Sequence, residues 1–230
     1  MRCTSIISAY FCEDWIQGRV TNLLEQTEVP AIVAVCQKGS KEDEILSKFP
    51  EVIRINTPDV PTVYKAWNLA LRCVQTEYVN IANSDDRLDV NAIKEMCDAL
   101  QENPDVGLVY PDCHVVYELN GEYVGELVAD DSQSLLSGCY IGPVPTYRRK
   151  LHELYGYFPD SYIVAGDYWE WLNFQAHGVK FMHIHKKLGV FYDRRYNPSI
   201  ENNIEYKFSN LTVWESARAI EYWKARWKSE

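Results

Sequence analysis

The sequence predicts an α/β fold: a Rossmann-like, mixed but mainly parallel sheet flanked by helices, with a helical segment at the C-terminal end. In the first half of the chain, strand-sized apolar runs alternate with segments of helical periodicity. The run Ala31-Ile32-Val33-Ala34-Val35-Cys36 is apolar at every position, which is typical of a strand buried on both faces of a parallel sheet. Later in the chain, Asn120-Gly121 between two strand-like runs indicates a hairpin, so the sheet should be mixed.

The first half reads as a regular alternation of strands and helices. We expect strands at residues 4–10, 31–36, 52–56 and 78–82, and helices at residues 13–26, 42–48, 63–74 and 90–102. Asp89 is expected to cap the last of these helices. That helix should stop before Pro104, because a residue that precedes proline disfavours helical geometry.

The second half has a different pattern. We expect strands at residues 106–110, 114–119, 122–127 and 180–185, an extended segment at 139–148, a helical turn at 151–154 and a helix at 168–177. Gly178 should end that last helix. A final amphipathic segment, 200–227, carries Ile204, Phe208, Leu211 and Trp214 at helical spacing. We expect it to pack on the domain or on a second copy of the chain, which would be a homodimer.

The composition limits the class of protein. With 230 residues, 47% of them hydrophobic, the chain can bury one full core. The net charge of −10 argues against a broad nucleic-acid surface. Seven cysteines without a Cys-x-x-Cys pair argue against a disulfide or zinc framework. No apolar run is long enough for a transmembrane span or a signal peptide, so we expect a cytoplasmic protein.

Two adjacent carboxylates, Asp85 and Asp86, follow the predicted strand 78–82 directly. Loops at the carboxyl ends of strands are where open α/β sheets bind ligands. Hard oxygen ligands on a short loop suit Mg²⁺ or Mn²⁺. An isolated pair of this kind more often caps or solvates a turn, so other parts of the chain have to decide between the two interpretations.

Four groups of motifs, taken in order along the chain, favour the metal site over the turn cap. They are Ser5-Ile6-Ile7-Ser8-Ala9-Tyr10; Ala66-Trp67-Asn68-Leu69-Ala70-Leu71; Asn83-Ser84-Asp85-Asp86; and a last block of Tyr147-Arg148-Arg149-Lys150-Leu151, Gly156-Tyr157-Phe158, Gly166-Asp167-Tyr168-Trp169-Glu170-Trp171-Leu172 and Gly178-Val179-Lys180-Phe181. From about residue 4 to 199, the chain resembles the family-two glycosyltransferases of GT-A fold. The third motif is similar to the family's Asp-x-Asp metal motif, and the last block is the most specific.

The resemblance implies an inverting transfer of a sugar from a nucleotide-diphospho-sugar, a UDP-sugar by default, to an acceptor hydroxyl. Residues 1–113 would form the nucleotide-sugar-binding half, 114–199 the acceptor-binding half, and 200–230 a C-terminal helix. Asp85 would hold Mn²⁺ or Mg²⁺. Asp167 would be the general base, with Gly166 in the place of the Glu of the family's Glu-Asp motif. The alternative for Asp167 is a plain N-cap of the helix 168–177.

The resemblance also implies further contacts with the substrates. The nucleotide-sugar would be bound by Ser8, Tyr10, Gln37, Asn68, Asn83 and Asp86. The acceptor or the phosphates would be contacted by Tyr147, Arg148, Trp169 and Arg194, for which the alternatives are core packing and solvent exposure. Asn83 and Gln37 both depart from the family, which carries an acid at each position, so the identity of the base cannot be transferred.

Two histidines in the predicted strand 180–185 belong to none of these motifs. His183 and His185 lie on one predicted strand, and we expect them to face opposite sides and not to share one ion. His185 could instead approach the diphosphate.

Two other classes of function compete with a transferase of sugars. A nucleotidyltransferase would need a Gly- and Lys-rich loop after the first strand, where Phe11-Cys12-Glu13-Asp14 is acidic. A degenerate binding or scaffold protein is suggested by Asn83 and Gln37, and the presence of both Asp85 and Asp167 argues against it. The acceptor is not readable: a glycan or a lipid-linked saccharide is the default, and a modified nucleobase or a protein side chain is another option.

Overall fold

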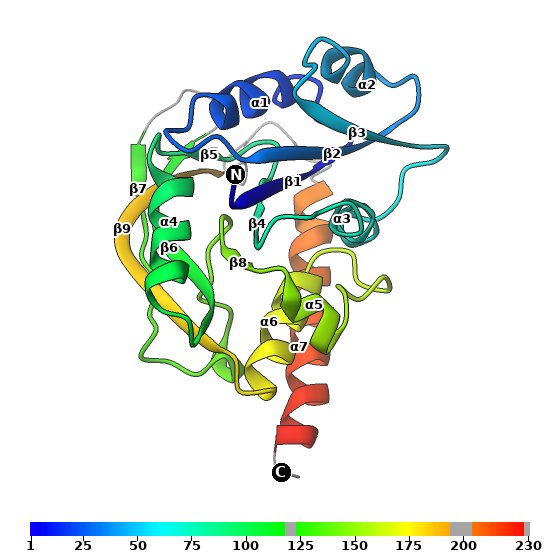
Figure 1. Cartoon of the computed structure of the whole chain (residues 1–230). Helices are drawn as coiled ribbons and strands as arrows, with labels where there is room; N and C mark the ends of the chain where they lie inside the picture. Colours follow the sequence, from blue (N-terminus) through cyan, green and yellow to red (C-terminus); the bar gives the residue numbers. More distant parts are fainter. Residues whose placement is uncertain (118–122, 194–203, 228–230) are drawn as a thin grey trace.

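The computed structural model describes residues 1–117, 123–193 and 204–227 (Figure 1). The strands are β1 Cys3–Ala9, β2 Ala31–Gln37, β3 Val52–Thr57, β4 Tyr78–Ile81, β5 Arg87–Leu88, β6 Val106–Tyr117, β7 Tyr123–Leu127, β8 Thr146–Arg148 and β9 Lys180–Asp193. The helices are α1 Ile16–Leu24, α2 Lys41–Leu46, α3 Val63–Leu71, α4 Ala92–Glu102, α5 Lys150–Tyr155, α6 Gly166–Ala176 and α7 Ile204–Trp227, with a short 3₁₀ helix η1 at Leu135–Ser137.

All described strands join one mixed sheet, as the sequence predicts. The order is β3-β2-β1-β4-β8-β6-β9-β5, and β7 pairs with β6. The first four strands in space, β3 to β4, are mutually parallel, while β8, β7 and β5 run antiparallel to their neighbours. The carboxyl ends of β1 to β4 therefore share one edge of the sheet, and β5 brings the end of β9 to the loop that follows β4.

Helices cover both faces of the sheet (Figure 1). One apolar core lies under α1, α2 and α4, and a second lies under α3, α5, α6 and α7. The apolar strand β2 contributes side chains to both cores, Val33 to one and Ile32 to the other. Burial on two faces is why its sequence shows no polar alternation.

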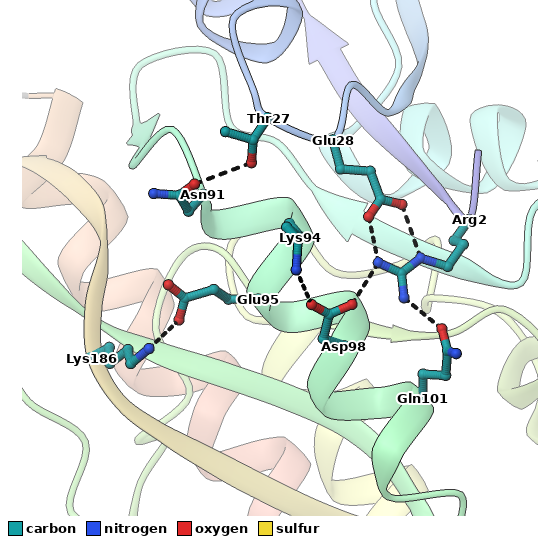
Figure 2. Close-up of polar contacts among 9 residues, drawn as sticks. All are labelled: Arg2, Thr27, Glu28, Asn91, Lys94, Glu95, Asp98, Gln101 and Lys186. Carbon is teal, nitrogen blue, oxygen red and sulfur yellow. Dashed lines mark hydrogen bonds and ion pairs between the residues drawn. The ribbon is translucent and has the colours of Figure 1, made fainter.

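Charged side chains fasten α4 to the sheet at the edge opposite the carboxyl ends of the strands (Figure 2). The guanidinium of Arg2, just before β1, donates to Glu28, to Asp98 at 2.8 Å and to Gln101 at 2.6 Å. On the same helix, Glu95 pairs with Lys186 of β9 at 2.7 Å. The helix α4 is thus tied both to the start of β1 and to β9.

The C-terminal helix α7 packs on α6, which confirms the packing predicted for this segment. Trp223 lies against Trp169 of α6, with ring centroids 5.3 Å apart, and Ala219 is fully buried. Trp214, in contrast, is 58% exposed, and the side chains of Ile204 and Phe208 lie outside the described residues. The homodimer stays a prediction. Among the described residues, no helix has the length and the apolar run needed to cross a bilayer.

Two local predictions are wrong. The helix expected at 90–102 begins at Ala92, with Asn91 as its N-cap, and the Asp89 carboxylate only accepts the N–H of Asn91 at 2.9 Å. The segment 139–148 forms a strand only over its last three residues, at β8. The predicted hairpin is present as the antiparallel pair β6 and β7, while its turn at Asn120-Gly121 lies outside the described residues.

The opposite orientation expected for His183 and His185 is also wrong, because residues two apart on a strand line the same face. In the pairing of β6 with β9, Pro111 lies opposite Ile184 but Asp112 lies opposite Lys187, so β9 carries extra residues at a bulge. A bulge bends the strand locally and changes the direction of nearby side chains. The two imidazole rings lie on the same side, with centroids 4.1 Å apart.

Candidate functional site

A cleft of about 500 Å³ lies at the shared carboxyl edge of β1 and β4. It is lined by residues from the ends of these strands, from the start of α3 and from two later segments. They are Ser8, Tyr10, Phe11, Val60, Pro61, Thr62, Val63, Trp67, Asn83, Ser84, Asp85, Asp86, Ile163 and Phe191. Five of the predicted site residues, Ser8, Tyr10, Asn83, Asp85 and Asp86, are therefore brought together.

Asp86 is the buried member of the acidic pair, with 1% of its surface exposed. Its Oδ2 accepts a hydrogen bond from Asn83 Nδ2 at 2.9 Å, and its Oδ1 accepts one from the backbone N–H of Tyr192 in β9 at 3.4 Å. Burial, followed by the charge of Asp85, raises the pKa of Asp86 to about 7. A cation at this pair would offset both effects, so the two carboxylates fit a divalent ion.

The loop that carries the acids is held from behind by Arg87, which does not line the cleft. Its Nη1 donates to the backbone carbonyls of Ser84, Asp85 and Asp86 at 3.0, 3.3 and 2.8 Å. The sequence places Arg87 beside the acids but gives no sign that its guanidinium turns back onto their backbone. Its contribution is to fix the direction in which the acidic side chains point.

A second arginine, Arg19 of α1, was missed by sequence reasoning. It is fully buried, and its Nη1 donates to the backbone carbonyl of Asp86 at 3.1 Å. Burial lowers the pKa of Arg19 to about 10, while the charge of Asp86 opposes that shift. A usable signal exists in the sequence, since Arg19 interrupts an apolar helical face that includes Ile16 and Leu23.

The cleft wall offers little positive charge of its own. No lysine or arginine lines it within the part of the chain that the structure describes. The start of α3, capped by Thr62 through the N–H of Lys65 at 3.3 Å, supplies the partial positive charge of a helix N-terminus. A bound diphosphate would therefore need a cation, and Asp85 and Asp86 are the lining residues that could hold one.

Gln37 lies beside the cleft at the end of β2. Its Nε2 donates to the carbonyl of Pro58 at 3.2 Å, and its strand neighbour in β3 is Thr57. The hydroxyl of Thr57 lies 2.8 Å from the hydroxyl of Tyr10, which lines the cleft. Gln37 is thus connected to the cleft through Thr57 and Tyr10 without lining it.

Asp167 sits in the first turn of α6, after the N-cap residue Ala165. Its Oδ1 accepts hydrogen bonds from the Tyr64 hydroxyl at 3.1 Å and from the N–H of Tyr168 at 2.8 Å. Burial raises its pKa above the ordinary value. Asp167 is not the N-cap, and it does not itself line the cleft; the nearby loop residue Ile163 does.

Gly166 precedes Asp167 because the ring of Tyr64 occupies the space of a side chain. A Cβ built on Gly166 would lie 2.7 Å from Cδ2 of Tyr64. A Glu at this position, which the resemblance would imply, does not fit beside the Tyr64 ring as it lies here. Tyr64 is 2% exposed and also contacts Trp67, which lines the cleft.

The loop that leads to Asp167 is held by Glu215 of α7, which sequence reasoning missed. The Glu215 carboxylate accepts three backbone hydrogen bonds, from Ile163 at 2.8 Å and from Val164 and Ala165 at 2.9 Å. The N–H of Ala165 belongs to the N-cap of α6, where a helix leaves donors unpaired, and the other two lie in the loop just before it. α7 thus supports the loop that contributes Ile163 to the cleft.

Comparison with known proteins was decisive for the family. The sequence model described as Glycosyl transferase family 2 matches residues 4–155, well over half of the 230 residues. The chain belongs to glycosyl transferase family 2. The matched segment contains the Asp85-Asp86 loop and ends before Asp167. A comparison with curated proteins gave no match to this family 2 chain.

Solved structures with the same fold agree with the predicted GT-A architecture. S. aureus TarS 1-349 in complex with UDP-GlcNAc has a TM-score of 0.76 at 17% identity, covering 97% of the family 2 chain and 66% of TarS 1-349. The mannosyltransferase PcManGT from Pyrobaculum calidifontis, in complex with GDP-Man and Mn²⁺, has a TM-score of 0.67 at 20% identity, covering 85% of this chain and 58% of that one. The family 2 chain thus spans between 58 and 66% of the length of these two structures.

Two residues predicted to contact acceptor or phosphate lie away from the cleft of the family 2 chain. Tyr147 is fully buried, with its hydroxyl 3.0 Å from His152 Nε2. Arg148 donates to the carbonyls of Leu100 at 2.6 Å and Val106 at 2.8 Å. The reason is topological, because β8 lies between β4 and β6 in the middle of the sheet and is covered on both faces.

Two more predicted contacts, Asn68 and Trp169, do not line the cleft. Asn68 binds the loop after α5, donating to the carbonyl of Phe158 at 2.8 Å and to Asp160 at 3.0 Å. Trp169 packs against Trp223 of α7. Arg194 lies outside the described residues.

Proposed function

We propose that this chain transfers one sugar from a nucleotide-diphospho-sugar, a UDP-sugar by default, to an acceptor hydroxyl with inversion. The observation that carries the proposal is the cleft itself. It has two adjacent carboxylates at one wall, no basic side chain among its described lining residues, and at another wall the loop that leads to the half-buried Asp167. The family match and the shared fold support the same reaction class.

The donor would lie along the carboxyl edge of β1 and β4. Ser8, Tyr10 and Asn83 would contact the nucleotide or the sugar, with Gln37 beside them and Asp86 on a ribose, a sugar or a water. Asp85 would hold Mn²⁺ or Mg²⁺. When bound, such an ion neutralises charge on the diphosphate leaving group. Arg87 and Arg19 keep the acidic loop in place through its backbone, which fixes the carboxylates before the donor arrives.

Asp167 would accept the proton of the acceptor hydroxyl. A carboxylate at a helix N-terminus is ordinarily a weak base. Here burial raises its pKa, while the bonds from Tyr64 and Tyr168 fix its Oδ1 in place. A raised pKa and a fixed position are the two properties that a general base needs near neutral pH.

The two halves of the domain would divide the work, with residues 1–113 binding the nucleotide-sugar, residues 114–199 the acceptor, and the C-terminal helix supporting the loop before Asp167. The acceptor class under this proposal is a glycan, a lipid-linked saccharide or another hydroxyl compound. The alternative of a degenerate binding or scaffold protein predicts binding of a donor without turnover. The family match gives no support to a nucleotidyltransferase.

The test combines donor binding with turnover. UDP and GDP are titrated by thermal shift in EDTA and in Mn²⁺, and release of nucleoside diphosphate from UDP-GlcNAc and GDP-Man is then measured. One of the nucleotides should stabilise the protein clearly more with Mn²⁺, and Asp85→Asn should remove that increment. Asp14→Asn, an exposed acid after β1 that does not line the cleft, is the matched control. Binding that ignores both the metal and Asp85→Asn would contradict the metal site, and binding without any turnover would favour the scaffold alternative.

A further inference from the structure

A second cluster of polar side chains lies outside the cleft, where the bulge of β9 meets the segment that follows β7. Asp131, His183 and His185 each direct one ligand atom to a common point, and these atoms all lie within 4.8 Å of one another. None of the three lines the cleft. His183 and His185 are two residues apart on β9, so they share one face of the strand, and their ring centroids lie 4.1 Å apart.

The carboxylate of Asp112 orients the His183 ring so that its other nitrogen is available as a metal ligand. The side chain of His183 is 2% exposed, and its Nε2 lies 2.7 Å from Oδ1 of Asp112. A carboxylate at that distance assigns the hydrogen to Nε2 and leaves the lone pair on Nδ1. Bonding of one ring nitrogen to a carboxylate is the arrangement that orients metal-binding histidines.

The other nitrogen of the ring is buried. Among the residues that the structure describes, His183 Nδ1 has no hydrogen-bond partner, and it lies 3.7 Å from Oδ2 of Asp131. Two acceptors face each other there, which is unfavourable unless something positive lies between them. The ring cannot easily turn away, because it is stacked on Tyr110 with centroids 5.2 Å apart and planes 6° apart.

The surroundings hold the cluster in shape. Asp112 also accepts the backbone N–H of Ala129 at 3.1 Å, which ties the segment after β7 to β6. Within the bulge, Lys186 points to the other side of the sheet and pairs with Glu95 of α4 (Figure 2). Lys187 pairs with Glu126. Both nearby lysines are therefore engaged with carboxylates of their own.

We propose that His183 Nδ1, a ring nitrogen of His185 and the carboxylate of Asp131 bind a zinc ion, with a fourth position open to water. Imidazole and carboxylate are ordinary zinc ligands, and imidazole nitrogens disfavour Mg²⁺. Tetrahedral zinc with bonds of about 2.0–2.2 Å holds its ligand atoms about 3.4 Å apart. Since His185 and Asp131 are exposed, their side chains can move by the remaining distance.

The bound ion would brace the segment between β7 and α6. Asp131 precedes η1, and the carbonyl of Leu135 in η1 accepts a hydrogen bond from the hydroxyl of Tyr168, which follows Asp167 in α6. A cation that joins Asp131 to β9 therefore reduces the freedom of a segment that contacts the helix carrying Asp167. This site is independent of the donor reaction proposed above.

The full chain, first treated with a chelator, is titrated with Zn²⁺ by calorimetry in excess Mg²⁺, which occupies carboxylate sites without competing for imidazole. We expect one zinc ion per chain at this site and a rise in melting temperature. His185→Gln and Asp131→Asn should each weaken zinc binding by on the order of 100-fold, and Asp112→Asn by about 10–100-fold. Co²⁺ in place of Zn²⁺ gives a visible absorption band that should disappear in the same variants.

Two controls separate this site from others. His114→Gln changes a histidine of the neighbouring strand β6 that is not in the cluster and should leave zinc binding unchanged. Asp85→Asn changes the cleft and should also leave it unchanged. His183→Gln removes a buried ring and can disturb folding, so the exposed His185 carries the test. Absence of zinc binding, full binding by His185→Gln, or loss of binding in Asp85→Asn would overturn the proposal and leave His183 as an ion-pair partner of Asp131.

Discussion

The Glu215 carboxylate in α7 accepts the backbone N–H of Ala165, the N-cap residue of α6, at 2.9 Å. Two residues that lie 50 positions apart in the chain thereby fix the start of the helix that carries Asp167. Glu215 also accepts the N–H groups of Ile163 and Val164, and it is 2% exposed. A buried carboxylate with three backbone donors does the work of a capping side chain that the sequence around Ala165 lacks.

Glu215→Ala should therefore destabilise the protein by about 2–4 kcal/mol, because three donors lose a charged acceptor in a buried site. Urea denaturation measures this loss. Glu221→Ala, an exposed acid on the same helix, is the matched control and should change the free energy of unfolding by less than about 0.5 kcal/mol. Equal effects of the two substitutions would mean that α7 contributes only general packing.

The acidic loop offers a second test at Asn83, whose amide donates to Asp86 at 2.9 Å. Asn83→Asp replaces a donor with a second negative charge beside a carboxyl whose pKa is already raised to about 7. In EDTA the variant should be less stable than the parent by about 1–3 kcal/mol. Mn²⁺ should raise its melting temperature more than that of the parent, since a third carboxylate strengthens a cation site.

Asn83→Ala is the companion variant for this test. It removes the same donor without adding charge, so it should lose stability in EDTA but gain nothing extra from Mn²⁺. If Mn²⁺ stabilises Asn83→Asp no more than Asn83→Ala, the cation does not bind at this loop.

Tight packing of Tyr64 on Gly166 gives a third prediction. Gly166→Ala places a Cβ 2.7 Å from the Tyr64 ring and should cost about 1–3 kcal/mol of stability, measured by thermal or urea unfolding. Gly138→Ala is the control, since no atom lies within 4 Å of its Cβ position. In the double variant with Tyr64→Leu the cost of the added methyl should be smaller, and strictly additive effects would show that the two residues are not in conflict.

The sequence alone predicts most of the fold because the parallel half depends on local signals. Apolar runs buried on both faces and helices with one apolar side, such as β2 and α4, can be read from residue spacing. The bulge in β9 after Ile184 cannot, because it arises from the pairing of β9 with β6 over a long separation. The same limit applies at the site. The position of Asp85 and Asp86 can be predicted because they directly follow a strand. The bonds of Arg87 to the loop carbonyls and of Glu215 to the loop N–H groups cannot, because they depend on tertiary contacts that leave no local sequence pattern.

The last prediction concerns Asp167 and pH. Burial raises the pKa of this carboxyl above its ordinary value of 3.8, so the charged form is penalised in the folded protein. At pH values below 3.8 the carboxyl is protonated in both the folded and the unfolded parent. The free energies of unfolding of Asp167→Asn and the parent should therefore differ least there. As the pH rises from 3.8 through the raised pKa of the folded protein, the parent should lose stability. The variant has no carboxyl here to ionise, so it should become the more stable of the two by a growing margin. Chemical denaturation of both proteins across this pH range measures the difference.

Turnover should respond in the opposite direction, because the proposed base works only when ionised. Asp167→Asn can still accept the bonds from Tyr64 and Tyr168 through its amide oxygen, so folding and donor binding should survive while turnover falls by roughly 100- to 10,000-fold. The parent's turnover should rise with pH through an apparent pKa above 3.8. Asp160→Asn serves as the control, since this carboxylate binds Asn68 away from the cleft. An Asp167→Asn variant that transfers sugar at the parental rate would show that another group takes the proton, and one that does not fold would show that Asp167 serves structure instead.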